Sequence, residues 1–292
     1  MNSDNLNLDV GPLVIGGVGG SGTRVLSKLA QDMNVHMGQF FNKPLDNLWF
    51  SLFFNQPKWA AAAHEHEVLQ SLDLFARASL EGFKGNASPE TEALIDACLS
   101  TSRLAIRAPE LGEATKRDIL HSVGIETSAY KQWGWKEPNS HIFIPQIAKF
   151  FPEARFILMV RNGLDMAFSR NQNQVILWGR RFGVQLDDPA NVSPSQSLQY
   201  WLAANAHARR NLEELMPGRW LEVRYENLLA DPVAEIVRIA EFIGTNLDPE
   251  LSQELAKLVE PPATVGRFRA KGLEAFHPDQ IEAVKALGFV VE

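Results

Sequence analysis

The sequence predicts an α/β fold in which helices pack against a mainly parallel central sheet. Two observations support this fold class. Short apolar runs alternate along the chain with longer segments of helical period, which is the pattern of parallel strands joined by helices. The first apolar run also passes through a glycine-rich turn directly into a helical segment. We therefore expect strands and helices to alternate from the first strand onward.

The expected strands are short apolar runs, and the expected helices are longer segments with apolar residues at helical spacing. In chain order, the expected strands are Leu13–Gly16, Leu104–Ala108, Trp133–Trp135, Phe156–Val160 and Trp220–Arg224. The expected helices are Gly22–Met33, Ser140–Phe151, Leu164–Ile176, Ser195–Leu215, Pro232–Ile243, Pro249–Val259 and Pro278–Leu287.

The size and composition of the chain are those of an ordinary globular protein. Hydrophobic residues make up 45% of the 292 residues and charged residues 22%, so we expect the whole chain to fold. We predict one domain over residues 1–292, with insertions over the sheet at about 39–83 and 172–194. The first insertion is crowded with aromatic residues, which indicate either core packing or an acceptor-binding wall. The second is polar and rich in turn-forming residues.

The charge distribution favours a small anionic ligand. The formal charge of −7 argues against nucleic acid or an anionic membrane surface as the main partner. Basic residues nevertheless cluster between Arg155 and Arg181, and again at Arg267, Arg269 and Lys271. Solvated charged faces are the alternative interpretation of both clusters.

Cysteine content and the N-terminal sequence limit the compartment and the site chemistry. The single cysteine, Cys98, excludes an intrachain disulfide and a multi-thiolate metal site. The N-terminal segment lacks the basic flank and apolar stretch of a signal peptide, and no window approaches the roughly 20 apolar residues that cross a bilayer. We therefore expect a cytoplasmic enzyme without a membrane span.

The segment PLVIGGVGGSGTRVLSKLAQ combines an apolar strand, a glycine-rich turn and the start of a helix. Glycine lets backbone N–H groups approach an anion closely, and a helix N-terminus adds partial positive charge. We therefore expect the loop Gly16–Arg24 to bind a phosphate or sulfate group. A tight strand-to-helix turn without a ligand is the alternative.

Three kinds of phosphate loop fit this pattern, and individual residues distinguish them. A P-loop nucleotide hydrolase would need lysine where Thr23 stands. Gly17, Gly19 and Gly22 have the dinucleotide-binding spacing, but that unit needs a second strand ending in Asp or Glu about 20 residues later. The segment NVHMGQFFNKP, which follows the helix, contains no such strand. Both of these alternatives are therefore disfavoured.

The third kind is indicated by GGSGTR, which resembles the 5′-phosphosulfate loop of sulfotransferases that use 3′-phosphoadenosine 5′-phosphosulfate (PAPS), usually PKSGTT or PRSGTT. The resemblance implies a three-layer α/β architecture like that of P-loop NTPases. It assigns to the 5′-phosphosulfate the residues Gly19, Gly20, Ser21, Gly22, Thr23 and Arg24. Gly20 stands where the family has Lys or Arg, so Arg24 or Lys43 would supply the cation.

A longer segment, WGWKEPNSHIFIPQIAKFFPEARFILMVRNGLDMAFSRNQ, resembles the family's K-x-P motif followed by a helix, a strand closing on Arg, and a helix bearing Ser. Arg161 follows the expected strand Phe156–Val160, at the carboxyl edge where open α/β sheets bind ligands. Asn162 can cap the next helix and so fix Arg161 at the crevice. The resemblance implies that Arg161 and Ser169 bind the 3′-phosphate of PAPS.

Two further segments extend the resemblance. RWLEVRYENLLADPVAEIVRIAEFIG is similar to the family's strand, YE-x-L and DP segment, which implies that Tyr225 lies near the adenosine. TVGRFRAKG is similar to the family's C-terminal basic segment. In that segment Arg267, Arg269 and Lys271 would alternate on an extended piece and hold the phosphates.

The resemblance implies an enzyme that moves a sulfuryl group from PAPS to a hydroxyl or amine of a small-molecule or carbohydrate acceptor and releases adenosine 3′,5′-bisphosphate (PAP). We expect no metal requirement, because sulfuryl transfer depends on positioning and charge stabilisation. Lys136 and Arg24 are the candidate cations, and Asp46 is the candidate base. Other candidates for the base are His36, His64, His66, Glu110 and His141. A nucleotide-dependent kinase and a non-catalytic PAP- or PAPS-binding protein are the alternatives.

Overall fold

The computed structural model describes residues 11–126, 129–186 and 188–292. The first ten residues, on which the expectation about a signal peptide depends, lie outside the described residues. Within the described ranges, no helix has both the length and the apolar character needed to cross a membrane.

A five-stranded sheet with the order β2-β3-β1-β4-β5 forms the centre of the protein. The strands are β1 (Leu13–Gly17), β2 (Val35–His36), β3 (Gln132–Lys136), β4 (Arg155–Val160) and β5 (Trp220–Arg224). Each pair of neighbouring strands is parallel, which confirms the predicted mainly parallel sheet. Because β1 is the central strand, the loop that follows it lies at the middle of the carboxyl edge, where such sheets bind ligands.

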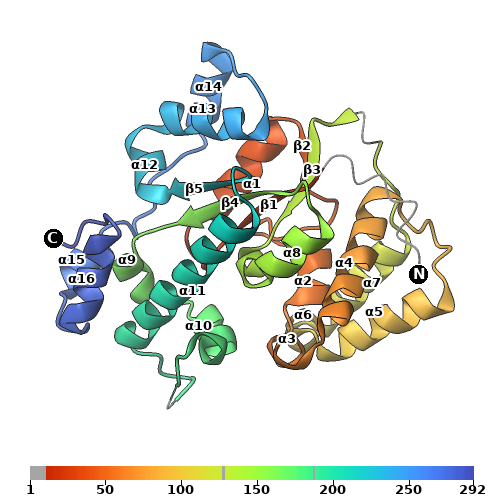
Figure 1. The fold of residues 1–292 in the computed structure, drawn as a ribbon, viewed down its shortest axis with the longest axis horizontal. Coiled ribbons are helices and arrows are strands. Elements are labelled where there is room, and N and C mark those ends of the chain that lie inside the picture. Colours follow the sequence, from red (N-terminus) through yellow and green to blue (C-terminus); the bar gives the residue numbers. More distant parts are fainter. Residues whose placement is uncertain (1–10, 127–128, 187) are drawn as a thin grey trace.

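Helices cover both faces of the sheet, so the protein has three layers (Figure 1). Leu13 and Ile15 of β1 pack into one apolar core and Val14 into the other, because side chains alternate between the faces of a strand. The first core includes helices α1 (Thr23–Asp32), α12 (Tyr225–Ala230), α13 (Pro232–Ile243) and α14 (Pro249–Ala256). The second includes α2 (Leu48–Phe54), α4 (Glu65–Leu80), α8 (Ile144–Phe150) and α11 (Pro194–Leu215).

Shorter or peripheral helices complete the fold (Figure 1). They are α3 (Pro57–Ala62), α5 (Pro89–Thr101), α6 (Arg103–Arg107), α7 (Pro109–Leu120), α9 (Gly163–Ala167), α10 (Asn173–Trp178), α15 (Arg267–Lys271) and α16 (Pro278–Ala286). The 3₁₀ helix η2 (Pro138–Phe143) lies beside the carboxyl edge of the sheet, and the 3₁₀ helix η3 (Gly179–Phe182) follows α10.

The predicted strand Leu104–Ala108 is wrong, because this segment lies in helix α6. Helices α6 and α7 pack closely: a Cβ added to Gly112 would lie 2.6 Å from the Cβ of Ala105. Ile106 is 59% exposed, whereas a strand inside this sheet would be buried on both faces. A short apolar run does not distinguish a helix from a strand by periodicity, so packing against α7 settles the conformation.

The predicted helix Leu164–Ile176 is two helices, α9 and α10. Between them the Ser169 hydroxyl accepts the N–H of Asn171, and the Gln172 side chain donates to the carbonyl groups of Ala167 and Ser169. Such side-chain bonds to the local backbone compete with helical hydrogen bonds and end the first helix.

Three further expectations are corrected. The predicted helix Ser140–Phe151 begins earlier, as η2, and continues as α8. A short strand, β2, exists where we expected none, although it ends at His36 and carries no acidic residue. The C-terminal basic residues lie on helix α15 and not on an extended segment, because Arg267–Lys271 folds back with a helical hydrogen bond from Gly272 to Phe268.

The first expected insertion packs its aromatic side chains into the core, whereas the second contributes to the cavity at the carboxyl edge of the sheet. The first contains α2, α3 and α4, and Trp49, Phe50, Phe53 and Phe54 are fully buried in it. Phe50 stacks on Trp135 of β3, with ring centroids 5.2 Å apart. None of the described aromatic side chains of residues 39–83 lines the cavity at the carboxyl edge, which favours core packing over an acceptor-binding wall. The second insertion contains α10 and η3, and α10 does line that cavity.

Candidate active site

A cavity of about 660 Å³ opens at the carboxyl edge of the sheet. Its walls come from the loop between β1 and α1, the end of β3 with η2, helix α10, helix α11 and the segment 258–260. A concave site of several hundred Å³ is the size that binds a small molecule. The cavity therefore lies where the topology of a parallel sheet predicts a ligand.

The phosphate loop is shaped by glycines and leaves a buried hydroxyl unpaired. The N–H of Ser21 donates to the carbonyl of Val18 at 3.1 Å, which closes the turn, and Gly22, at a φ of 103°, precedes the first turn of α1. The Ser21 hydroxyl is buried and has no hydrogen-bond partner among the described residues. An unpaired hydroxyl beside the N-terminus of α1 fits an anion, because both would donate to its oxygens.

Tyr225 packs directly on this loop. A Cβ added to Gly22 would lie 2.6 Å from the Tyr225 ring, so only glycine fits between the ring and the loop backbone. The ring is buried and also carries the Arg161 guanidinium 5.3 Å from its centroid. Tyr225 thus separates the cavity, which it lines, from the polar cluster around Arg161.

Gly20, by contrast, faces open space. A Cβ added there would meet only the Met166 methyl at 3.9 Å, although the φ of 94° disfavours other residues. Arg24 is exposed on the cavity wall and has no hydrogen bond or ion pair within the described part of the chain. Lys43 is exposed and does not line the cavity, so Arg24 is better placed to supply a cation beside the loop.

Lys136, at the end of β3, is almost fully buried and is held by the loop that contains Asp46. Its ammonium group donates to the Asp46 carboxylate at 2.5 Å and to the Pro44 carbonyl at 2.7 Å. The loop is fixed in turn, because the Asn47 N–H donates to the Lys136 carbonyl at 2.8 Å. Burial lowers the pKa of Lys136, and the adjacent Asp46 carboxylate opposes that effect. The structure therefore brings two of the predicted catalytic residues into one ion pair on the cavity wall.

Glu137, the middle residue of the K-x-P motif, is a second buried carboxyl group on this wall. Its two oxygens accept the backbone N–H of Asn139 at 2.6 Å and the side-chain N–H of Asn139 at 2.9 Å. Burial raises the pKa of Glu137 above the ordinary carboxyl range, and the nearby Asp46 charge adds to this rise.

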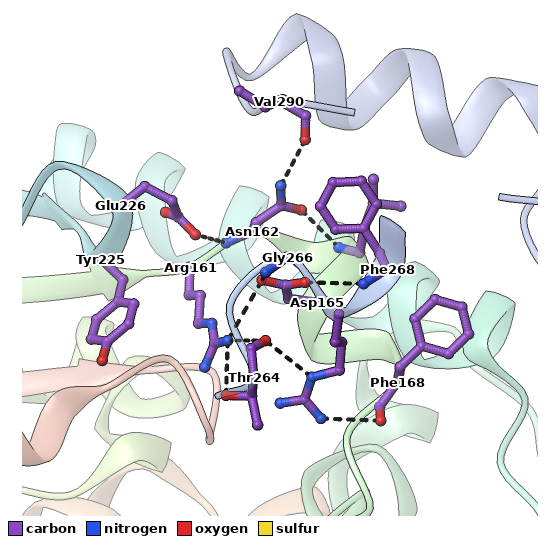
Figure 2. A network of polar contacts seen from close by, with 12 residues as sticks. Arg161, Asn162, Asp165, Phe168, Tyr225, Glu226, Thr264, Gly266, Phe268 and Val290 are labelled. Atoms are coloured by element: carbon purple, nitrogen blue, oxygen red, sulfur yellow. Dashed lines mark hydrogen bonds and ion pairs between the residues drawn. The ribbon is translucent and has the colours of Figure 1, made fainter. Parts of the chain in front are cut away.

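The polar cluster around Arg161 joins the end of β4 to the C-terminal segment (Figure 2). The Arg161 guanidinium donates to the Thr264 carbonyl at 2.6 Å and lies 3.5 Å from the Asp165 carboxylate. Asp165 also accepts the N–H of Gly266 at 2.7 Å. The Nε of Arg161 is buried and finds no acceptor within the described ranges. The cluster therefore offers an unpaired N–H donor next to Tyr225.

Of the three C-terminal basic residues, one joins this cluster. Arg267 donates to the carbonyl groups of Thr264 and Phe168, at 3.2 and 3.1 Å. It therefore shares the Thr264 carbonyl with Arg161 and contacts the residue that precedes Ser169 in the chain. Arg269 donates to the Glu292 carbonyl, and Lys271 is exposed; neither lines the cavity. Ser169 itself is half-buried outside the cavity wall.

The remaining candidates for the base lie elsewhere. His36, His64, His66, Glu110 and His141 are all described, and none of them lines the cavity. His141 is a buried residue of η2, and burial lowers its pKa to about 4. Polar residues of the cavity wall that were not predicted from the sequence include Asn139, Gln174 and Tyr200. Glu137 entered the prediction only as the middle residue of the K-x-P motif. Its position next to Lys136 is the sequence signal that could have indicated a functional role.

The fold and the cavity define an α/β protein in which the glycine-rich loop after β1 and a buried lysine at the end of the neighbouring strand β3 line one cavity. A model of the sulfotransferase family matches residues 12–249. The chain therefore belongs to the sulfotransferase family.

Individual relatives agree with this assignment over shorter stretches or at the level of the fold. A Caenorhabditis elegans protein named "Putative protein-tyrosine sulfotransferase" is 27% identical over 124 residues, which are 42% of this chain and 42% of that protein. A Caenorhabditis briggsae protein of the same name is 30% identical over 122 residues, 41% of this chain and 38% of that protein. Each match thus spans less than half of the relative's length. The solved sulfotransferase domain from the curacin biosynthetic pathway has the same fold, with a TM-score of 0.52 and 16% identity over 97% of this chain and 99% of that domain.

Proposed function

We propose that the enzyme transfers a sulfuryl group from PAPS to a hydroxyl or amine of a small-molecule or carbohydrate acceptor. The observation that carries this proposal is the buried Lys136–Asp46 ion pair, which lines the same cavity as a phosphate loop with an unpaired Ser21 hydroxyl. When bound, PAPS would supply an activated sulfuryl group on its 5′-phosphate. Because two relatives carry the name "Putative protein-tyrosine sulfotransferase", tyrosine phenols should also be tested as acceptors.

The loop residues would bind the phosphosulfate, and the two cations would balance its charge. The Ser21 hydroxyl and the backbone N–H groups of residues 20–24, apart from that of Ser21, which donates to Val18, would donate hydrogen bonds to its oxygens. The Lys136 ammonium would stabilise the charge that develops on the departing phosphate oxygen, and Asp46 would hold that ammonium in place. Arg24 would supply the second positive charge. In the family motif this charge belongs to a Lys or Arg at the position of Gly20.

Arg161 and Arg267 would bind the 3′-phosphate, with Ser169 next to them. The unpaired Nε of Arg161 supports this role, because a buried guanidinium N–H without an acceptor is costly. Tyr225 would lie against the adenosine, between the loop and Arg161. Arg269 and Lys271 would contribute only after a rearrangement of α15, since Arg269 donates to the Glu292 carbonyl.

Replacing Arg161 with alanine should weaken PAP binding by about 1.5–3 kcal/mol, or about 10- to 150-fold, because a charge-assisted contact to phosphate is lost. Titration calorimetry with PAP measures this change. Arg117→Ala, on the exposed surface of α7, is the matched control and should leave the affinity unchanged. Equal affinities of the Arg161→Ala variant and the unaltered enzyme would contradict the assignment.

The test of the function as a whole is a comparison of two nucleotides. We expect calorimetry to show binding of PAP without a divalent ion, and no comparable binding of ATP with Mg²⁺. Tight ATP·Mg²⁺ binding without PAP binding would indicate the nucleotide-dependent kinase. PAP binding without turnover would indicate a non-catalytic binding protein. A PAP-formation screen with phenols, sugars and amines then identifies the acceptor class.

A further inference from the structure

Two buried polar side chains on the cavity wall have no role in donor binding. Glu137 lies at the end of β3, and Tyr200 lies on α11. The Tyr200 ring and hydroxyl are fully buried, and the hydroxyl has no hydrogen-bond partner in the parts of the chain that the structure describes. A buried phenol without a partner is unfavourable, so this hydroxyl on a cavity wall points to a ligand group.

Glu137 and Tyr200 both line this cavity, and helix α11 packs against η2, which Glu137 caps. Burial raises the pKa of Tyr200, and the charge of Glu137 raises it further, as expected for a carboxyl group near a phenol. The backbone and side-chain N–H groups of Asn139 hold one Glu137 oxygen each, so the carboxyl group is fixed while each oxygen keeps a free lone pair.

Asp46 is in a different position. One of its oxygens accepts from Lys136, and the other accepts from the Asn42 side chain at 2.8 Å. A carboxylate paired with an ammonium group is a weaker base than one without a cation, because the positive charge favours the ionised form. Glu137 forms no ion pair with any described residue, so it is the better base of the two.

We propose that Glu137 is the general base for the acceptor hydroxyl and that Tyr200 positions the same hydroxyl by donating a hydrogen bond to its oxygen. This inference rests on the proposed sulfuryl transfer. In that step the acceptor O–H proton moves to the Glu137 carboxylate as the acceptor oxygen bonds to sulfur. The bond between sulfur and the 5′-phosphate oxygen breaks, and that oxygen keeps the electron pair next to Lys136.

A chain of hydrogen bonds through Asn139 and Gln174 connects Glu137 to the phosphate loop. The side-chain oxygen of Asn139 accepts a hydrogen bond from the Gln174 side-chain amide at 2.8 Å, and the side-chain oxygen of Gln174 accepts the Gly19 N–H at 2.5 Å. The family motif has proline at the position of Gly19 and therefore no N–H there. In this chain the additional N–H is bound by Gln174 of α10, which ties the orientation of Asn139 and Glu137 to the loop that holds the donor.

The groups that face Glu137 set the pH at which it can act. Burial and the Asp46 charge favour the protonated carboxyl group, whereas the Asn139 hydrogen bonds and the Lys136 charge favour the carboxylate. Tyr200 is neutral, because burial raises its pKa. The positive charge of Arg24 lowers the pKa of Lys136. The rate should therefore rise with pH as Glu137 loses its proton, and the midpoint should lie above the ordinary carboxyl range.

The decisive variants are Glu137→Gln and Tyr200→Phe, with Glu153→Gln and Tyr130→Phe as controls on exposed parts of the chain. The acceptor probes are N-acetyl-tyrosinamide and methyl glucoside, with PAPS as donor. Glu137→Gln should lower kcat by about 10²- to 10⁴-fold and abolish the rise of kcat with pH. Tyr200→Phe should raise the acceptor KM by about tenfold. Calorimetry should show PAP affinity within about twofold of the unaltered enzyme for all four variants.

Infrared spectroscopy provides a readout that needs no acceptor. With glutamate labelled at its carboxyl carbon, the unliganded enzyme should show a buried carboxylic acid band at neutral pH that disappears as the pH rises. The band should be absent from Glu137→Gln and present in Asp46→Asn. Its absence from the unaltered enzyme would overturn the inference, as would a pH rise that survives Glu137→Gln but not Asp46→Asn. Failure of the unaltered enzyme to bind PAP would instead refute the proposed function.

Discussion

Replacing Lys136 with methionine should lower kcat by about 10²- to 10³-fold with little change in PAP affinity. The Lys136 ammonium is buried and held by Asp46 and the Pro44 carbonyl, so its charge acts from a fixed position at low dielectric. Its contribution should therefore be greatest when the departing phosphate oxygen gains charge, and smaller in the ground state. Steady-state PAP formation at saturating PAPS measures kcat, and calorimetry measures the affinity for PAP.

The control for this variant is Lys149→Met. Lys149 forms an ion pair with Glu65 in which both side chains are 56% exposed, so its loss should leave kcat unchanged. Because removal of Lys136 leaves Asp46 without its cation, thermal unfolding should accompany the kinetics. A folded Lys136→Met enzyme with normal kcat would contradict the catalytic role.

Replacing Gly22 with alanine should reduce PAP affinity by about 30-fold or more. The added methyl group would lie 2.6 Å from the Tyr225 ring, at a backbone φ of 103°. We expect about 1–3 kcal/mol from the overpacked contact and about 1–2 kcal/mol from the left-handed backbone. The loop can relieve this only by moving away from Tyr225, which displaces the donors that face the phosphosulfate. Calorimetry with PAP and the thermal unfolding midpoint measure the two consequences.

Gly218→Ala is the control variant, because it introduces backbone strain without a steric clash. Gly218 has a φ of 72°, and an added Cβ there would meet no atom within 4 Å. This variant should lose some stability and keep its PAP affinity. If Gly22→Ala binds PAP as tightly as Gly218→Ala does, the contact between Tyr225 and the loop does not shape the donor site.

The sequence predicted the parts of the site that local patterns encode. The strand, glycine turn and helix around Ser21 were visible because apolar runs and glycines act within a few residues of each other. Lys136 and Arg161 were selected by the resemblance to the family. Lys136 ends one strand and Arg161 directly follows another, and all strands of a parallel sheet end at one edge. Errors arose where the local pattern was ambiguous, as at Leu104–Ala108, or where polar side chains ended a helix at Ser169.

The sequence by itself therefore determined the fold class, the phosphate loop and the residues at the strand ends. Tertiary structure alone determined which of these residues meet. Lys136 and Asp46 are 90 residues apart, Arg161 and Thr264 are 103 apart, and Gly19 and Gln174 are 155 apart. Such contacts leave no periodic signal, because they depend on how loops from distant segments pack over one edge of the sheet. For the same reason, the pairing of Asp46 with Lys136, which leaves Glu137 as the carboxyl group without a cation, followed only from the folded chain.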